Sequence, residues 1–338
     1  MVLARRWALR VHFQGAPKLE DFELVQEELE PLQDGEIFYQ SEFISVDPYQ
    51  RNYTLRMPIP PPFTMPGSVV GQVKDSRNLD FPVGTRVVVY DGWREAGIIN
   101  PTTAGNHGTG LDMVRKAPDI GNLPLSLLLG ACGMPGNTAY FGVTEICRPQ
   151  KGETVLVTGA AGAVGSLVGQ ISKVKGCKVI GFAGSDDKVA WLKDNLAFDE
   201  AFNYKKTTME TSLSKGVPQG VDCFFDNVGG EDASSVIAAM NVCGRVACCG
   251  AIASYNVKEP LKTTAIQYFL IRKRLKMEGF QAAQFKDRWD EGVLQMAKWI
   301  QEGKLKPQET VVDGFENTPN AFMGLFSGDN LGKMVVKV

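Results

Sequence analysis

A glycine-rich turn between an apolar strand and an apolar-periodic helix is the clearest chemical feature of this sequence. Residues 155–188 read VLVTGAAGAVGSLVGQISKVKGCKVIGFAGSDDK, with Gly159, Gly162 and Gly165 spaced by three residues. Gly162 has no Cβ, so the backbone can approach a pyrophosphate there, and Gly165 lets the helix pack close to the strand. The helix N-terminus supplies free N–H groups and the positive end of the helix dipole. The pattern predicts dinucleotide binding, with a merely tight turn as the alternative.

The next strand lacks the acidic residue that marks an NAD site. In NAD-specific sites, an Asp or Glu at the end of this strand binds the ribose 2′-hydroxyl. Here the strand CKVIGFAG ends in Ala183–Ser185, and Lys188 follows. This small neutral turn leaves room for a 2′-phosphate, and Tyr204, at the end of the following strand, can place its hydroxyl nearby. We therefore expect NADP(H), with Asp186–Asp187 as cap and dipole partners of the next helix. A solvent-facing helix residue is the alternative reading of Lys188.

Strand and helix patterns alternate around this turn, over residues 123–310. The strands are apolar throughout, which is typical of strands buried on both faces of a parallel sheet. Residues 123–146 are expected to be helical with a Gly/Pro break, and a further helix is expected near residues 283–302. These patterns predict an α/β domain with a Rossmann doubly wound parallel sheet.

The first 122 residues contain short β-like runs broken by Gly, Pro and Asp. Such runs predict an antiparallel, barrel-like β domain. The tail 311–338 ends in the run GKMVVKV, which we expect to return to the first domain. The predicted division is therefore a discontinuous β-rich domain, residues 1–122 with 311–338, and a nucleotide-binding domain, residues 123–310. A length of 338 residues fits two domains better than one.

The composition argues against several kinds of partner and centre. A formal net charge of −2 gives no support for a nucleic-acid or membrane partner. No apolar run reaches the roughly 20 residues of a membrane span, so we expect a cytoplasmic protein. The seven cysteines form no CxxC pair, and the only histidines are His12 and His107. We therefore expect no zinc or other metal site.

Several motifs spread along the chain resemble one known family. They are VDPYQR (46–51), GMPGNTAYFG (133–142), GAAGAVGSLVGQ (159–170), GSDDKVAWL (184–192), FDNVGGE (225–231), CGAIASYN (249–256), MEGF (277–280) and the tail 314–338. The chain resembles the zinc-independent branch of the medium-chain dehydrogenase/reductase superfamily, and within it the prostaglandin and alkenal double-bond reductases. This likeness implies a GroES-like β-barrel domain beside the Rossmann domain. It also implies a homodimer formed through the edge of the nucleotide-domain sheet.

The resemblance also implies which residues hold the cofactor. It places Gly162, Ala163, Val164 and Gly165 around the pyrophosphate. It places Lys188 and Tyr204 at the 2′-phosphate, and Asn227 near the ribose or nicotinamide. Lining the nicotinamide side it places Cys249, Gly250, Ala251, Ile252, Ala253, Ser254, Tyr255, Phe280, Gln281 and Ala282, with Asn330 closing over the cofactor. Simpler readings are a turn cap for Asn227, a core residue for Phe280 and a left-handed position for Asn330.

The activity implied by the resemblance is NADPH-dependent reduction of the carbon–carbon double bond of α,β-unsaturated ketones and aldehydes. Oxo-prostaglandins and alkenals are candidate substrates, and oxidation of a hydroxy-leukotriene is a possible reverse reaction. Charge would develop on the carbonyl oxygen, so donors aimed at that oxygen would set the rate. Tyr255 is the first candidate donor and Tyr49 the second, because a tyrosine with a pKa of about 10 is neutral at pH 7. A half-buried packing role is the alternative for both tyrosines.

Two other functions stay open at this point. Quinone reduction is possible, because zinc-free relatives share the glycine turn and the two domains. A non-catalytic NADPH-binding protein is the third reading, although the near-neutral charge argues against a nucleic-acid partner.

Overall fold

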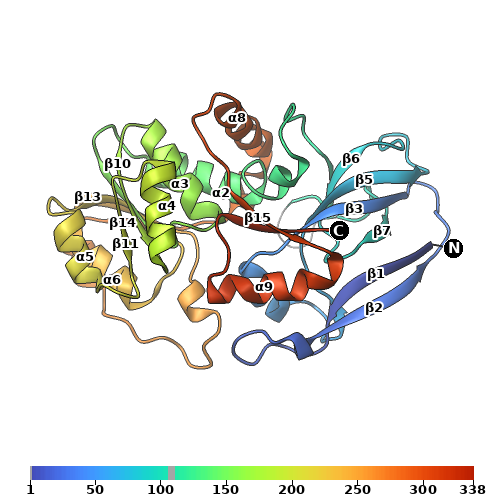
Figure 1. Cartoon of the computed structure of the whole chain (residues 1–338), viewed down its shortest axis with the longest axis horizontal. Helices are drawn as coiled ribbons and strands as arrows, with labels where there is room; N and C mark the ends of the chain where they lie inside the picture. Colours follow the sequence, from blue (N-terminus) through green and yellow to red (C-terminus); the bar gives the residue numbers. More distant parts are fainter. Residues whose placement is uncertain (1, 106–110) are drawn as a thin grey trace. The chain divides into compact units, whose positions relative to one another are not determined.

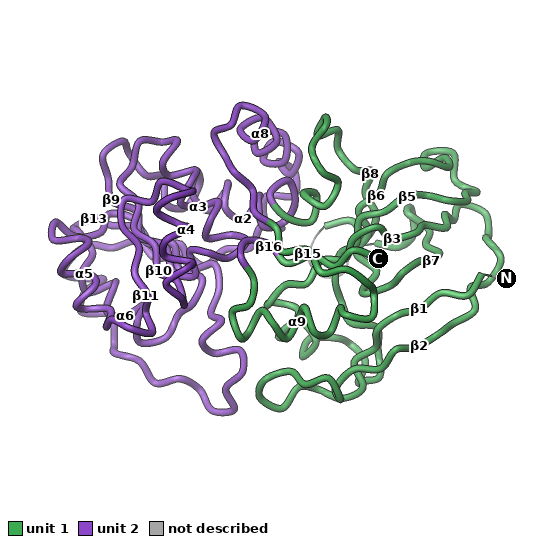
Figure 2. Tube along the Cα trace, viewed as in Figure 1, with its two compact units in different colours: residues 1–130, 309–330, 334–338 green, residues 131–308, 331–333 purple. Residues whose placement is uncertain are grey.

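The chain folds into two units, coloured separately in Figure 2. Unit 1 contains residues 1–130, 309–330 and 334–338, and unit 2 contains residues 131–308 and 331–333. The structure is a computed structural model that describes residues 2–105 and 111–338, so His107 lies outside the described residues. The sequence analysis predicted domain boundaries after residues 122 and 310, whereas the two units divide after residues 130 and 308. The turn η3 (Leu125–Leu129) belongs to unit 1, where it packs against the strands β3 (Ile37–Ser45) and β5 (Val69–Ser76).

Unit 1 is rich in antiparallel strand pairs (Figure 1). Besides β3 and β5, its strands are β1 (Val2–Leu9), β2 (Phe22–Leu29), β4 (Phe63–Thr64), β6 (Arg86–Val89), β7 (Ala96–Ile99), β8 (Val114–Lys116), β15 (Glu309–Asp313) and β16 (Lys333–Lys337). Within the described residues they form one sheet ordered β2-β1-β4 and another ordered β15-β16-β3-β5-β6-β8, with β7 paired to β3. The last strand, β16, thus pairs antiparallel with β3.

The helical segments of unit 1 are short. They are α1 (Tyr49–Tyr53), α9 (Thr318–Ser327) and the 3-10 turns η1 (Leu19–Asp21), η2 (Thr54–Arg56) and η7 (Phe315–Asn317). Helix α9 begins at Thr318-Pro319, where proline's missing N–H costs nothing, and ends before Gly328 in the left-handed conformation. The sequence thus encodes both ends of α9.

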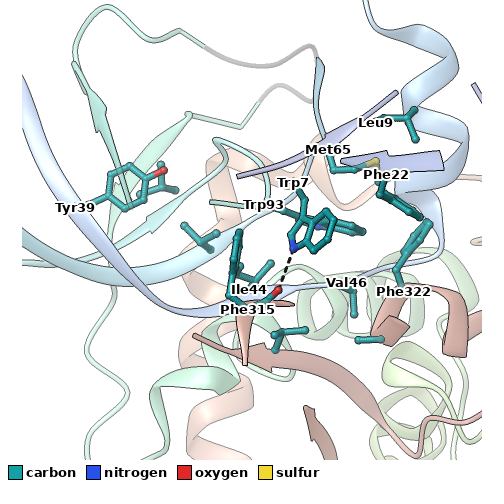
Figure 3. Close-up of a cluster of buried hydrophobic side chains, with 14 of the residues drawn as sticks. Trp7, Leu9, Phe22, Tyr39, Ile44, Val46, Met65, Trp93, Phe315 and Phe322 are labelled. Atoms are coloured by element: carbon teal, nitrogen blue, oxygen red, sulfur yellow. Dashed lines mark hydrogen bonds between the residues drawn. The ribbon is translucent and has the colours of Figure 1, made fainter. Parts of the chain in front are cut away.

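An aromatic cluster joins the returning tail to the first strands of unit 1 (Figure 3). The indole N–H of Trp7 donates to the carbonyl oxygen of Phe315 at 3.0 Å. Phe322 meets Trp93 edge-on, with ring centroids 5.4 Å apart, and Trp93 stacks on Phe22 at 5.8 Å. Each such ring pair adds roughly 0.5–1.5 kcal/mol beyond the area it buries. The tail is therefore part of the core of unit 1.

Unit 2 is built around one parallel sheet. Its strands are β9 (Thr154–Val157), β10 (Lys178–Ala183), β11 (Glu200–Asn203), β12 (Val221–Asp226), β13 (Met240–Cys248) and β14 (Lys276–Gly279). Their order is β11-β10-β9-β12-β13-β14, and every neighbouring pair is parallel. This is the 3-2-1-4-5-6 strand order of a Rossmann sheet, as the apolar strand runs predicted.

Helices precede, connect and follow these strands (Figure 1). They are α2 (Met134–Phe141), α3 (Ala163–Val174), α4 (Asp186–Leu196), α5 (Met209–Gly216), α6 (Gly230–Ala239), α7 (Gln267–Lys273) and α8 (Trp289–Gln301), with the turns η5 (Ile252–Ser254) and η6 (Ala282–Arg288). Helix α2 continues as one π-helical segment, η4 (Gly142–Cys147). Among the described residues, no helix is both long enough and apolar enough to cross a membrane.

Candidate functional site

The strand order of unit 2 reverses between β9 and β12. From β9 the chain proceeds through β10 to β11, whereas β12, β13 and β14 add to the other side. In open α/β sheets, ligands bind beyond the carboxyl ends of the strands at such a switch point. The glycine turn follows β9 and Asn227 follows β12. Both therefore lie where the fold predicts a ligand.

A hydrogen-bond network joins the ends of these two strands. The Thr158 hydroxyl donates to Asp226 Oδ1 at 2.8 Å and accepts from the Asn227 N–H at 3.0 Å. The Asn227 side-chain amide donates to the Thr158 carbonyl oxygen at 2.8 Å. Asp226 Oδ1 also accepts from the N–H groups of Val228 and Gly229, both at 2.9 Å. These bonds hold the Asn227 side chain beside the strand end, and buried Thr158 and Asp226 were not among the predicted site residues.

The glycine turn has the backbone geometry that the sequence predicted. Gly159 has φ +60°, and Gly162 is the N-cap of α3 with no side-chain cap. A Cβ added at Gly165 would lie 2.3 Å from the Gly159 carbonyl oxygen, so only glycine permits this close approach. A Cβ added at Gly162 would meet only that same oxygen, at 3.3 Å. The space beyond Gly162 is therefore open to a ligand.

The first turn of α3 fits a pyrophosphate. Gly162, Ala163 and Val164 are half-buried, whereas Gly165 is buried against the strand end. The first N–H groups of a helix have no acceptor within the helix, and they attract an anion together with the helix dipole. The four predicted pyrophosphate residues therefore lie together in one turn at the N-terminus of α3, as an anion site would require.

Ser185 begins the helix that follows β10. Its side-chain oxygen accepts from the Lys188 N–H at 3.3 Å, which makes it the N-cap of α4. The sequence analysis assigned the cap of this helix to Asp186 and Asp187. That assignment was wrong, because these residues lie one and two positions after the N-cap, Ser185. Asp186 and Asp187 occupy the first helical turn, where acids favour the helix dipole. Asp186 accepts from the Asn203 side chain at 2.7 Å and pairs with Lys206.

The end of β10 also carries the predicted features of a 2′-phosphate site. Tyr204 is 49% exposed, and its N–H donates to the Ala183 carbonyl oxygen at 3.2 Å. Its hydroxyl lies 3.0 Å from the position that a Cβ of Gly184 would take. Lys188 follows in the first turn of α4. The Tyr204 hydroxyl and Lys188 thus both lie near the end of β10, and Asp186 in the same turn pairs with Lys206.

The turn after β13 is tied to the end of β12. The N–H groups of Cys249 and Gly250 donate to the Asp226 carbonyl oxygen at 2.8 and 3.1 Å, and the Ala253 N–H donates to the Val228 carbonyl oxygen at 3.1 Å. The predicted nicotinamide-side residues of this turn are Cys249, Gly250, Ala251, Ile252, Ala253, Ser254 and Tyr255. They follow β13 and are held by these backbone bonds at the end of the neighbouring strand β12.

Tyr255 folds back over its own turn. Its hydroxyl accepts from the Ala251 N–H at 3.4 Å. Burial raises the pKa of Tyr255 above 10, and the Ala251 N–H acts in the opposite direction. The hydroxyl is therefore protonated at neutral pH. Because its oxygen accepts from the backbone, its own proton can be donated to another acceptor.

The remaining predicted cofactor residues differ in their burial and in their contacts. The Phe280 N–H donates to the Cys248 carbonyl oxygen at 3.3 Å, but its buried ring packs against Phe225, with centroids 5.9 Å apart. Gln281 is exposed and Ala282 is buried. Asn330 directly precedes the segment 331–333, in which the Gly332 N–H donates to the Ala161 carbonyl oxygen at 2.9 Å. That segment lies along the glycine turn.

Tyr49, the second candidate donor, belongs to unit 1. It is the first residue of α1, is half-buried, and meets the Tyr53 ring edge-on at a centroid distance of 6.5 Å. Burial, followed by the influence of Tyr90 and Asp47, raises the pKa of Tyr49 well above 10. Its hydroxyl is therefore neutral at physiological pH and can donate a hydrogen bond.

Comparisons with known proteins agree with this geometry. Residues 5–105 match a family described as N-terminal domain of oxidoreductase, and residues 163–299 match one described as zinc-binding dehydrogenase. Prostaglandin reductase 1 from Bos taurus is 47% identical over 100% of both chains. The chain belongs to the zinc-independent medium-chain dehydrogenase/reductase family. This membership confirms the resemblance and the predicted fold class, a Rossmann sheet plus a GroES-like domain.

Other members of the family extend the comparison. The 2-alkenal reductase (NADP(+)-dependent) from Nicotiana tabacum is 37% identical, with 98% of this chain and 96% of that protein covered. The crystal structure of CurA in complex with NADPH from Vibrio vulnificus has a TM-score of 0.89 at 36% identity and covers 99% of each chain. Among the described residues, no group of three or more His, Cys, Asp or Glu side chains is placed to hold a metal ion.

Proposed function

We propose that this chain is an NADPH-dependent reductase of the carbon–carbon double bond in α,β-unsaturated ketones and aldehydes. The observation that carries the cofactor choice is the acid-free end of β10, where the Tyr204 hydroxyl lies beside Gly184. The reaction is supported by membership of a family that includes a prostaglandin reductase and a 2-alkenal reductase. The proposed site residues of unit 2 follow the carboxyl ends of the six strands of its parallel sheet.

Each part of the cofactor has a proposed set of partners. Gly162, Ala163, Val164 and Gly165 bind the pyrophosphate through backbone N–H groups at the N-terminus of α3. Lys188 and Tyr204 bind the 2′-phosphate, while Lys206 pairs with Asp186 in the same turn. Asn227 and the turn 249–255 lie along the ribose and nicotinamide, together with the backbone of 280–282. Asn330, the proposed residue of the tail, directly precedes the segment 331–333 that bonds to the glycine turn.

The proposed chemistry depends on charge developing at the substrate's carbonyl oxygen. When bound, the nicotinamide supplies a hydride to the β-carbon, and a proton added at the α-carbon completes the saturated product. The Tyr255 hydroxyl donates a hydrogen bond to the oxygen as it gains enolate character. Such a preoriented donor stabilises the transition state more than the ground state. Burial keeps Tyr255 protonated, so it can donate without carrying charge.

Tyr49 is the second candidate for the hydrogen-bond donor. It lies in α1 of unit 1, and its pKa is held well above 10 by burial. A neutral donor of this kind stabilises developing negative charge without a metal ion.

The finer substrate assignment is part of the same proposal. Oxo-prostaglandins and alkenals combine a conjugated carbonyl with an apolar chain, and both suit this chemistry. Oxidation of a hydroxy-leukotriene would use the same groups in reverse. We propose a cytoplasmic location, because the seven cysteines are all free thiols, which a reducing compartment maintains.

We also propose a homodimer formed through strand β14. All four residues of this edge strand are exposed, and an exposed edge presents unpaired backbone groups to another strand. Apolar side chains accompany it: Ile271 is 78% exposed, Tyr268 62% and Met277 44%. Exposed apolar groups beside a sheet edge are typical of a surface covered by a second copy.

The reaction is tested by following NADPH absorbance after addition of an enone, an alkenal or a quinone of similar size. The proposal expects NADPH consumption with the enone and alkenal, and little with NADH. Consumption with the quinone alone would assign the chain to quinone reduction instead.

A further inference from the structure

Thr158 and Asn227, which directly follow the neighbouring strands β9 and β12, are joined by two hydrogen bonds. The Asn227 N–H donates to the Thr158 hydroxyl at 3.0 Å, and the Asn227 side-chain amide donates to the Thr158 carbonyl oxygen at 2.8 Å. Thr158 is buried, whereas Asn227 is half-buried. Thr158 therefore holds both the backbone and the side chain of Asn227, and we call these two bonds the Thr158–Asn227 clamp.

Asp226 fixes the direction of the Thr158 hydroxyl. A carboxylate oxygen only accepts, so the hydroxyl donates its proton to Asp226 Oδ1, at 2.8 Å. A lone pair of the hydroxyl oxygen is then available to the Asn227 N–H. The clamp thus requires a hydroxyl at position 158, because a valine of similar shape can neither donate nor accept.

The clamp also determines which end of the Asn227 amide can serve a ligand. The Thr158 carbonyl oxygen only accepts, so the amide atom that lies 2.8 Å from it must be Nδ2. The other end of the amide, Oδ1, is not bonded to Thr158. Within the part of the chain that the structure describes, no group donates a hydrogen bond to Oδ1. Asn227 therefore presents an oriented acceptor that lacks a protein donor.

Asn227 lies beside two of the turns proposed to hold the cofactor. A Cβ added at Gly159 would lie 3.5 Å from Asn227 Cβ, and one added at Gly250 would lie 2.8 Å from the Asn227 carbonyl oxygen. An acceptor between these turns repels phosphate oxygens, which also accept, and attracts a hydroxyl or an amide N–H. The nicotinamide half of the cofactor has both kinds of donor, on its ribose and its carboxamide.

We propose that Thr158 is a positioning residue for the cofactor. It orients Asn227 so that Oδ1 accepts a hydrogen bond from the ribose or the carboxamide of the nicotinamide half. This inference rests on the proposed function, in which Asn227 lies along that half. Thr158 is buried and acts through Asn227 rather than by touching the cofactor.

Titration calorimetry with NADPH and with 2′,5′-ADP, which lacks the nicotinamide half, tests this role. Thr158→Val should weaken NADPH binding roughly five- to tenfold, the effect of misaligning one hydrogen bond, and leave 2′,5′-ADP binding unchanged. Thr158→Ser keeps the hydroxyl and should bind NADPH like wild type. So should the control Thr144→Val, which removes a hydroxyl bonded to the Tyr140 carbonyl oxygen at 2.8 Å. Equal losses for both ligands, or equal losses in Thr158→Val and Thr158→Ser, would overturn the proposal.

Variants of Asn227 test whether Thr158 acts through this residue. In the Asn227→Ala background, Thr158→Val should cause no further loss of NADPH affinity, and an additional loss would overturn the proposal. Asn227→Asp keeps an acceptor but has no N–H to donate to the Thr158 carbonyl oxygen, so it should lose as much affinity as Asn227→Ala. This change lies at a half-buried position and needs no alteration of the core. Wild-type affinity in Asn227→Asp would also overturn the proposal.

A ligand-free measurement tests the clamp itself. The Asn227 backbone amide proton should exchange slowly with solvent in wild type and in Thr158→Ser, and faster in Thr158→Val, as followed by NMR. The same exchange rate in all three proteins would overturn the clamp. The expected binding and exchange results in a protein that reduces no enone would refute the proposed function and leave the role of Thr158 intact.

Discussion

Tyr255 is the side chain on which the proposed chemistry most depends. Its oxygen accepts from the Ala251 N–H, which leaves its proton for the substrate. Tyr255→Phe removes that donor and keeps the ring, so we expect kcat/KM for an enone to fall roughly 10- to 100-fold. Tyr140→Phe, which removes only a hydroxyl bonded to Glu291 at 3.0 Å, is the matched control and should retain wild-type rates. Steady-state kinetics check both, and equal rates for the two variants would remove Tyr255 from the mechanism.

Lys188 should decide between NADPH and NADH. Its place in the first turn of α4, beside the acid-free end of β10, suits it to the 2′-phosphate. Lys188→Ala should weaken NADPH binding roughly tenfold or more, since hydrogen bonds to charged groups contribute about 1.5–3 kcal/mol, and leave NADH binding unchanged. Lys193→Ala on the same helix, whose ammonium pairs with Glu200 at 3.1 Å, is the control. Titration calorimetry with both nucleotides measures the ratio, and parallel losses for NADPH and NADH would contradict the assignment.

The turn from β9 into α3 gives two glycines different roles. A Cβ at Gly165 would lie 2.3 Å from the Gly159 carbonyl oxygen, so Gly165→Ala must push the helix from the strand. Overpacking of this kind costs about 1–3 kcal/mol, and we expect a lower Tm together with lost cofactor binding.

Gly162→Ala is the matched variant for this element. Its Cβ would meet only the Gly159 carbonyl oxygen at 3.3 Å, and its backbone has φ −85°, which alanine adopts freely. The fold should keep its Tm while NADPH binding is lost, because the methyl group occupies the space of the pyrophosphate. Thermal unfolding with and without NADPH distinguishes the two variants. A Gly162→Ala protein stabilised by NADPH as strongly as wild type would contradict pyrophosphate binding at this turn.

Local patterns explain what the sequence could predict about these elements. The Gly159, Gly162 and Gly165 spacing and the apolar strands around it are short-range signals, and they predicted both the turn and the parallel sheet. The cap of α4 was misassigned because Ser185, Asp186 and Asp187 are all good capping residues. Only the backbone position of each, with Ser185 bonded to the Lys188 N–H, separates them.

Contacts distant in sequence could not be predicted in this way. Thr158 and Asp226 meet because β9 and β12 are neighbours in the sheet, and nothing near either residue signals the bond. The leucines of η3 carry an apolar pattern that suits a core in either unit, and only their packing on β3 and β5 assigns them.

The complete protein should be a dimer if β14 is covered by a second copy. Ile271→Glu places a charge among the exposed apolar groups next to this edge and should shift the protein toward monomer. Leu294→Glu, at an exposed position on α8, is the control and should leave the assembly unchanged. Sedimentation velocity measures the state of each. A wild-type protein that sediments as a monomer at micromolar concentration would contradict the dimer.

The identity of the product tests the proposed reaction most directly. An enone and NADPH carrying deuterium at the transferred position are incubated with the protein, and the product is examined by NMR and mass spectrometry. Hydride delivery to the β-carbon predicts a saturated ketone with deuterium at that carbon. An allylic alcohol with deuterium at the former carbonyl carbon, or an unreacted enone, would contradict double-bond reduction.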